Sequence, residues 1–198
     1  MTENFGMRAQ KIIFSGELPP TADRVHAQTA AIGANLSQDQ LEEVLEDINN
    51  LYNFKQTIYL EEIAAAVDEV TQCVGEQTRL MGLQITLGKS LVPSAVVSLR
   101  TSDGKQMTTE ASGNSSTDAI FSAIQQAMKI RVFLSDFNYG NITQGACALG
   151  RATVTVEHHG QHVTARAYSI DILEASAKAF LIALNKIDKN RKEQFKNI

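Results

Sequence analysis

Hydrophobic and polar positions follow two different periods along this chain. Between about residues 21 and 70 the apolar residues recur every three or four positions, which is the spacing of an amphipathic helix. One stretch starts with the capping box Ser37-Gln-Asp-Gln40 and continues with an apolar face made of Leu41, Val44, Leu45, Ile48, Leu51 and Tyr52. A second apolar stripe is made of Leu60, Ile63, Ala64, Val67 and Val70. The pattern predicts a small helical hairpin or a three-helix unit.

From about Gln77 the apolar residues alternate with polar ones, which is typical of half-buried strands. Three short strands are predicted, LQITL, AVVSLR and KQMTTEAS, with turns at GKSLVP and SDG between them. A helix follows, because the polar segment 113–118 precedes apolar residues at helical spacing, namely Ile120, Ala123, Ile124 and Ala127.

The same order of elements then recurs. The strand FLSDFNY is followed by the loop GNITQGACALG, the strand ATVTVEH, a turn at His159-Gly160, the strand HVTARAYS and a helix from about Ile170 to Ile187. The segments AVVSLRTSDGKQMTTEAS and ATVTVEHHGQHVTARAYS share the alternation and the glycine turn. We therefore predict an α+β fold: a small N-terminal helical unit, then two βββα repeats packed together as strands with helices on one side, since neither repeat can bury a sheet face alone.

We expect three parts along the 198 residues: an N-terminal segment 1–20, a helical linker subdomain 21–74 and a domain of two βββα units over 75–198.

The composition, 43% hydrophobic and 20% charged with a net charge of -4, is that of an ordinary globular protein. Without a basic stripe, nucleic acid is not an expected partner. No apolar stretch approaches the roughly 20 residues that span a bilayer, and no leader pattern opens the chain, so we expect no membrane partner and a cytoplasmic location. Cys73 and Cys147, far apart in sequence, are expected to be reduced, small apolar packing residues.

The last predicted helix carries a long motif, SIDILEASAKAFLIALN over residues 169–185. It closely resembles the final helix of the regulatory domain of 2-isopropylmalate synthases and their citramalate synthase relatives. Gly113-Asn114 with Asp118-Ala119 resembles the start of that domain's first helix, Ala148-Leu149-Gly150 resembles the end of its effector loop, and residues 33–63 are similar to the linker between catalytic barrel and regulator. The resemblance covers about residues 21 to 188.

The catalytic part of that family does not appear in this sequence. Those synthases condense acetyl-CoA with a 2-oxo acid on a TIM barrel, whose divalent metal is held by an Asp near the first strand and an HxH pair, and neither motif occurs here. We therefore expect a module that is not catalytic alone and needs no cofactor. His158, His159 and His162 form the one histidine cluster. We favour an exposed hairpin tip over a metal site, because Glu157 is the only further ligand type nearby.

The resemblance implies a homodimer that binds leucine or a similar branched-chain amino acid, with the loop Asn138 to Gly150 closing over the effector. Such an effector needs N–H donors, an acceptor and a small dry pocket. The helix starts at Ser115–Asp118 and Ser169–Asp171 offer donors, small loop residues allow close approach, and apolar side chains supply a wall. The candidate effector-binding residues are Asp118, Ile120, Ile124, Tyr139, Gly140, Gly145, Ala146, Ala148 and Asp171. The simpler alternatives are that the two Asp residues are ordinary helix-start charges and that the loop is only a connection.

Two departures from the family pattern bear on this site. Cys147 stands where an Asp is usual, which removes an acceptor for an ammonium group, and Ala165-Arg166-Ala167 replaces a glycine-containing stretch. Our leading hypothesis is an allosteric amino-acid-binding regulatory and dimerisation module that regulates a separately encoded barrel. The alternatives are the C-terminal part of a split synthase, an acyltransferase whose barrel is on another chain, and a degenerate dimerisation module that binds no effector.

Overall fold

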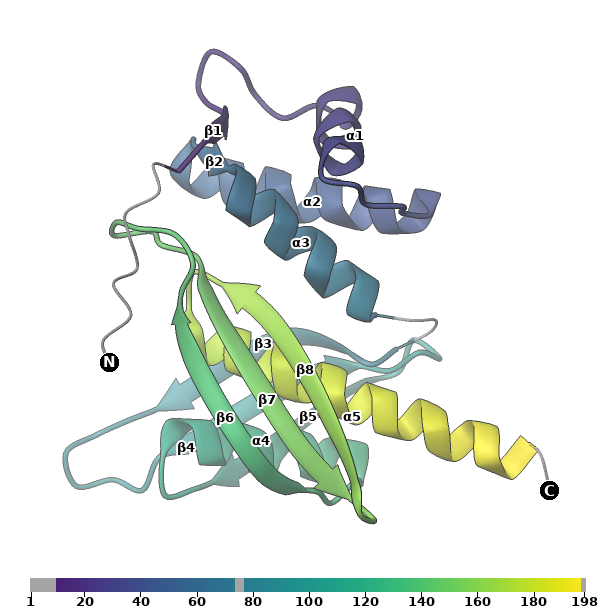
Figure 1. The fold of residues 1–198 in the computed structure, drawn as a ribbon. Helices are drawn as coiled ribbons and strands as arrows, with labels where there is room; N and C mark the ends of the chain where they lie inside the picture. The colour runs from purple at the N-terminus through teal and green to yellow at the C-terminus, as the bar shows by residue number, and fades with distance from the viewer. Residues whose placement is uncertain (1–9, 74–76, 197–198) are drawn as a thin grey trace, which may run out of the picture. The chain divides into compact units, whose positions relative to one another are not determined.

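The computed structural model describes residues 10–73 and 77–196, which form two compact units (Figure 1). The helical unit consists of residues 10–71 together with the distant segment 142–147. The repeat unit consists of the described residues of 72–141 and 148–196. The domain boundaries expected from the sequence stay a prediction.

The helical unit contains three helices and a short two-stranded ladder. In chain order these are β1 (Ile12–Phe14), α1 (Ala22–Ala31), α2 (Gln38–Lys55), β2 (Ile58–Tyr59) and α3 (Leu60–Gln72), whose last residue belongs to the repeat unit. β1 pairs antiparallel with β2. Three helices are therefore present, rather than a hairpin of two.

The capping box at the start of α2 is confirmed. The Ser37 Oγ accepts a hydrogen bond from the Gln40 backbone N–H at 3.3 Å, and the Ser37 N–H donates to Gln40 Oε1 at 3.0 Å. Two backbone donors at the helix start are thereby satisfied without water. α2 is followed by its C-cap residue Gln56, which adopts the left-handed conformation with φ of 57° and turns the chain toward α3.

The apolar stripe predicted for α3 is right except at one position. Ile63 and Val70 are buried, but Ala64 is exposed, and Glu62 and Ala65 are buried instead. The periodicity alone could not show this, because an alanine carries little hydrophobic signal and a glutamate is assigned to the solvent side by default.

The repeat unit confirms the predicted succession of two βββα repeats. The first comprises β3 (Arg79–Thr86), β4 (Ser94–Arg100), β5 (Gln106–Ser112) and α4 (Ser116–Met128). The second comprises β6 (Phe133–Asn141), β7 (Gly150–His158), β8 (Gln161–Ser169) and α5 (Ile172–Lys196). Each repeat forms a three-stranded antiparallel sheet in sequential order, and the first strand of each has a register shift, between Leu80 and Gly82 and between Leu134 and Asp136.

One apolar core joins the two repeats. Alternate residues of β4 and β7 are fully buried, namely Ala95, Val97 and Leu99 in β4 and Ala152, Val154 and Val156 in β7. Phe121 of α4 stacks on Phe180 of α5, with ring centroids 4.1 Å apart and an interplanar angle of 11°. The two helices therefore pack against each other and cover the inner sides of the strands, as expected of repeats that cannot each bury a sheet face alone.

The turn between β7 and β8 also follows the sequence prediction. His159 and Gly160 have φ angles of 51° and 78°, and the flanking pair His158 and Gln161 closes the ladder. Two consecutive positive φ angles match the right-handed twist of the strands, so this is a two-residue hairpin turn in which glycine relieves strain.

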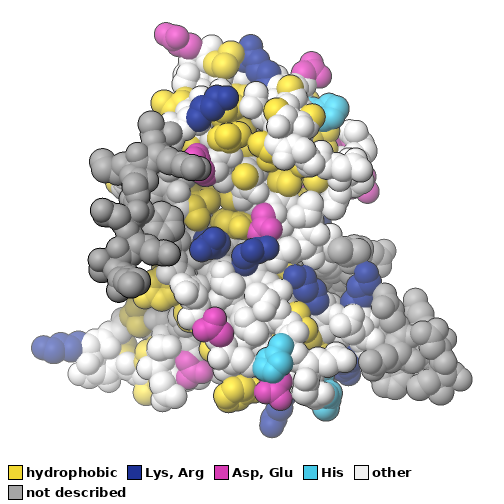
Figure 2. Space-filling model, in the orientation of Figure 1, with side chains coloured by type: hydrophobic (Ala, Val, Ile, Leu, Met, Phe, Trp, Pro, Cys, Tyr) yellow, Lys and Arg dark blue, Asp and Glu magenta, His cyan; other side chains and the backbone are white. Residues whose placement is uncertain are grey.

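The final helix is longer than the apolar pattern indicates. Among the residues up to 192, whose burial is described, the last buried one is Ile187, but the helix continues to Lys196 through a mostly polar segment without glycine or proline. An ion pair between Lys192 Nζ and Asp188 Oδ2 at 2.7 Å supports this last part. Within the described ranges, no helix has the length and apolar character needed to cross a membrane. Basic and acidic side chains are interspersed on the face drawn in Figure 2.

Candidate functional site

The connection between β6 and β7 is the candidate effector loop. β6 extends to Asn141, because residues 138–141 pair with residues 153–150 of β7, so the loop comprises 142–149 and is shorter than predicted. Its first part, residues 142–147, belongs to the helical unit. Gly145 has a φ of 100°, a conformation that favours glycine, and Gly145 and Ala146 are both exposed. No described atom lies within 4 Å of a Cβ built on Gly140 or Gly145, so both positions border open space.

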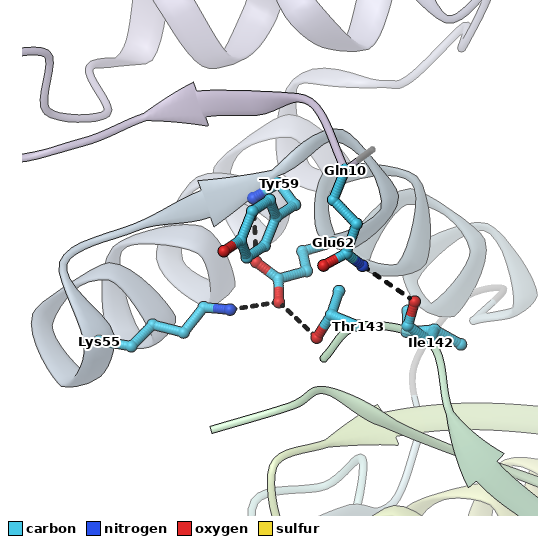
Figure 3. Close-up of polar contacts among 6 residues, drawn as sticks. All are labelled: Gln10, Lys55, Tyr59, Glu62, Ile142 and Thr143. Carbon is cyan, nitrogen blue, oxygen red and sulfur yellow. Dashed lines mark hydrogen bonds and ion pairs between the residues drawn. The ribbon is translucent and has the colours of Figure 1, made fainter. Parts of the chain in front are cut away.

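The beginning of this loop is anchored by two hydrogen bonds within the helical unit (Figure 3). Thr143 is 3% exposed, and its hydroxyl donates to Glu62 Oε1 at 3.1 Å. The Gln10 side-chain amide donates to the Ile142 carbonyl at 3.3 Å. The anchored Thr143 lies two residues before Gly145, so the loop has a fixed start and an open middle.

Glu62 holds the centre of this arrangement. Its Oε1 accepts from Thr143 and forms an ion pair with Lys55 Nζ, while its Oε2 accepts from the Tyr59 backbone N–H at 3.0 Å. The side chain of Glu62 has no exposed surface and that of Lys55 is 8% exposed. A carboxylate loses much hydration free energy on burial, and here a cation and two further donors offset that loss.

Local sequence explains how Glu62 comes to face inward. It is the third residue of α3, a position from which a glutamate side chain reaches back to the N–H of the residue before the helix, here Tyr59. Lys55 ends α2, and its ammonium lies 5.0 Å from the centroid of the Tyr59 ring. None of the roles of Lys55, Glu62 and Thr143 was predicted from the sequence. The one available signal was a glutamate at the third position of a predicted helix.

The predicted residues Asp118 and Asp171 both lie at helix starts and already bind local backbone. Asp118 Oδ2 accepts from the Asn114 backbone N–H at 2.8 Å, and Asp171 Oδ1 accepts from the Leu173 N–H at 2.8 Å and the Glu174 N–H at 3.4 Å. Each carboxylate thus stabilises a helix start or the turn that leads to it. Their role toward an effector stays a prediction.

The other predicted residues differ widely in exposure. Ile120 and Ile124 are completely buried in the core of the repeat unit, so contact with a ligand would require that core to open. Tyr139 of β6 is 63% exposed, and its ring lies 5.7 Å from that of Phe137. Gly140, Ala148 and these three residues belong to the repeat unit, whereas Gly145 and Ala146 belong to the helical unit. Effector binding by this set also stays a prediction.

The two departures from the family pattern have clear structural settings. Ala165 and Ala167 point into the core and Arg166 lies between them, so the arginine adds a charge without entering the apolar interior. The backbone of Arg166 is bound by the Gln72 side chain, which donates to its carbonyl at 3.0 Å and accepts from its N–H at 2.9 Å. Cys147 is half-buried in the loop, while Cys73 packs against the core of the repeat unit.

The histidine cluster lies on the β7–β8 hairpin as expected. His158 Nδ1 is 2.9 Å from the Arg131 carbonyl, and the rings of His158 and His159 are 4.2 Å apart. Among the described residues, no group of three or more His, Cys, Asp or Glu side chains is placed to hold a metal ion.

The repeat unit has two βββα repeats on one apolar core, and its described strands form two three-stranded antiparallel sheets rather than a barrel. A family model described as LeuA allosteric (dimerisation) domain matches residues 57–188. The chain belongs to this family, and the resemblance stated from the sequence is confirmed.

Individual relatives agree with the family match. A 2-isopropylmalate synthase of Dictyoglomus turgidum is 35% identical over 157 residues, which are 79% of this chain and 31% of that enzyme. The 2-isopropylmalate synthases of Picosynechococcus sp. and Rhodopseudomonas palustris are 29% and 33% identical over 185 residues, 93% of this chain and 34% and 35% of theirs. The chain thus spans about a third of the length of these relatives. It is a regulatory and dimerisation module of the 2-isopropylmalate synthase type.

Proposed function

We propose that this module binds leucine or a similar branched-chain amino acid at the loop 142–149 and thereby regulates a 2-isopropylmalate synthase barrel in the cytoplasm. The observation that supports the proposal most is the loop itself, which combines a buried anchor at Thr143 with exposed small residues at Gly145 and Ala146. Backbone N–H groups of such residues suit a carboxylate, because no side chain larger than the methyl group of alanine blocks its approach.

The effector's ammonium group needs an acceptor, and the loop has no carboxylate at Cys147. Asp118 and Asp171 already accept backbone hydrogen bonds. Loop carbonyls are therefore the acceptors that we propose. A neutral acceptor binds an ammonium more weakly than a carboxylate does, so we expect lower affinity than a site with an aspartate at Cys147 would have.

We propose that two copies of the chain associate through the repeat unit. Among the described strands β6 pairs with β7 alone, so it is an edge strand, and it exposes Phe133 at 69% and Tyr139 at 63%. Exposed aromatic residues on an unpaired edge suit a protein interface, and a second copy is the partner that the dimerisation family supports.

Regulation follows if the effector binds two states of the assembly unequally. The catalytic barrel that responds is on a separate chain in our leading proposal. A split synthase, in which the acyltransferase activity belongs to the assembly, is the alternative. A module that binds no effector is favoured by the absence of a carboxylate at Cys147 and is tested by the same experiment.

A thermal-shift titration with leucine, isoleucine, valine and alanine tests effector binding, because a ligand that binds only the folded state raises its melting temperature. We expect a rise with leucine or isoleucine and none with alanine. The variant Ala146→Leu should abolish the rise by filling the open side of the loop, whereas Ala27→Leu, the same change on the exposed surface of α1, should leave it unchanged. A flat melting temperature with all four amino acids at millimolar concentration would reject the sensing proposal.

A further inference from the structure

Three segments of the helical unit meet at a single buried carboxylate. Glu62 binds the end of α2 through Lys55, the start of α3 through the Tyr59 N–H, and the effector loop through Thr143 (Figure 3). Thr143 is 81 residues away in sequence from Glu62. The loop is therefore held by a polar side chain at the junction of two helices, a place that is more often packed with apolar side chains.

The bonds to Glu62 are unequal in what their loss would cost. Removing Lys55 would leave a buried carboxylate without its cation, which is strongly unfavourable. Removing Thr143 would leave Glu62 with its ion pair and its bond to the Tyr59 N–H. The hydroxyl of a threonine that turns toward solvent finds water, so neither partner is left unsatisfied. The bond from the loop is thus the one that can open while the junction of α2 and α3 stays intact.

Coupling through such a bond would need two arrangements of the loop. The structure shows the anchored one, in which Thr143 is bound to Glu62, and the other would be a released one, in which it is not. A ligand that contacts the loop near Gly145 and Ala146, two and three residues beyond Thr143, binds the two arrangements unequally if its contacts need the anchored backbone.

We propose that Glu62 is a positioning residue for the effector loop and that the effector binds the anchored arrangement, in which Thr143 donates to Glu62. This inference rests on the proposed function. Effector binding and the Thr143–Glu62 hydrogen bond then stabilise each other. Bound effector therefore strengthens the attachment of the loop to Glu62, where α2 and α3 meet.

The test compares Thr143→Val with Thr143→Ser in the full chain. Valine keeps the branched shape and removes the donor, and serine keeps the donor and removes the methyl group. Amide hydrogen exchange of residues 142–147 without ligand measures the anchor, and calorimetric titration with leucine measures the affinity. We expect Thr143→Val to speed exchange in the loop and to weaken leucine binding at least about fivefold. Thr143→Ser should resemble the unchanged protein in both measurements.

The outcomes separate the two proposals. Equal exchange rates in Thr143→Val and the unchanged protein would overturn the positioning role of Glu62. Faster exchange with unaltered leucine affinity would overturn the coupling while leaving the anchor and the effector site in place. If the unchanged protein binds none of the branched-chain amino acids, the proposed function and the coupling both fail, and the exchange comparison still decides whether Glu62 positions the loop. A loss of folding in Thr143→Val, seen as a collapsed melting transition, would show that the bond cannot open on its own and would overturn the switch.

Discussion

The two units bury their central residues by different means. Among the described residues, the buried polar side chains of the repeat unit are uncharged, and its centre is the stacked pair Phe121 and Phe180. The helical unit buries the charged Glu62 as well as apolar residues such as Ile58 and Ile63. Apolar burial is non-directional, whereas a buried carboxylate demands particular donors at particular places. The first arrangement gives stability, and the second specifies which segments must meet.

The largest effect that we expect comes from breaking the apolar centre. Phe180→Ala removes a fully buried ring and its stacking on Phe121, which should lower the free energy of unfolding by about 4 kcal/mol. Urea unfolding followed by circular dichroism measures it. Val92→Ala, which truncates a side chain that is 69% exposed in the same unit and lies outside the proposed interface, is the control and should change stability by less than about 0.5 kcal/mol. Similar losses in both variants would contradict the central place given to the stacked pair.

The next effect sharpens the contrast with the helical unit. Lys55→Met leaves the Glu62 carboxylate buried without its cation and should cost about 3 kcal/mol of unfolding free energy. The double variant Lys55→Met with Glu62→Leu removes the charge as well and should recover most of that loss. Urea unfolding of the unchanged protein, the two single variants and the double variant gives the interaction free energy of the two side chains in a double-mutant cycle. Additive losses would mean that the two side chains do not interact, contrary to the structure.

The smallest effect concerns a charge at the surface of the repeat unit. Hydrogen bonds from the Thr101 hydroxyl and the Lys105 N–H hold the pKa of Asp103, in the β4–β5 turn, below its usual value of 3.8. A carboxyl whose pKa is lower in the folded state stabilises the fold above its unfolded pKa, and this contribution is lost as the pH falls through the folded pKa. Asp103→Asn should therefore lower the melting temperature slightly at pH 7, and the difference should shrink as the pH falls through the folded pKa of Asp103. A difference that grows toward low pH would have the wrong sign for this mechanism.

Much of the fold could be predicted because it depends on local pattern. Three features depend only on residues that are close together in sequence: the change of period near Gln77, the capping box at Ser37 and the positive-φ turn at His159-Gly160. The extension of α5 beyond Ile187 was missed, because a polar continuation has no apolar period to follow.

The candidate site was harder to predict, for physical reasons. Helical spacing marks Ile120 and Ile124 as inward-facing but cannot distinguish the wall of a pocket from a sealed core, and the structure places them in the core. The anchor of the loop joins Glu62 to Thr143 across 81 residues, and no local period records such a pairing. What the sequence did indicate is the loop and its small residues.

The side-chain amide of Gln72 makes the two edge strands of the second sheet, β6 and β8, different from each other. By bonding both the carbonyl and the N–H of Arg166, it occupies a place on β8 where a further strand would otherwise attach. An incoming strand would have to displace two hydrogen bonds there, and a third polar group, Lys186 Nζ, lies 3.2 Å from the nearby Thr164 carbonyl. Addition of a strand, and with it the open-ended stacking that leads to fibres, is discouraged at the β8 edge, so the association that we propose through β6 would end at a pair.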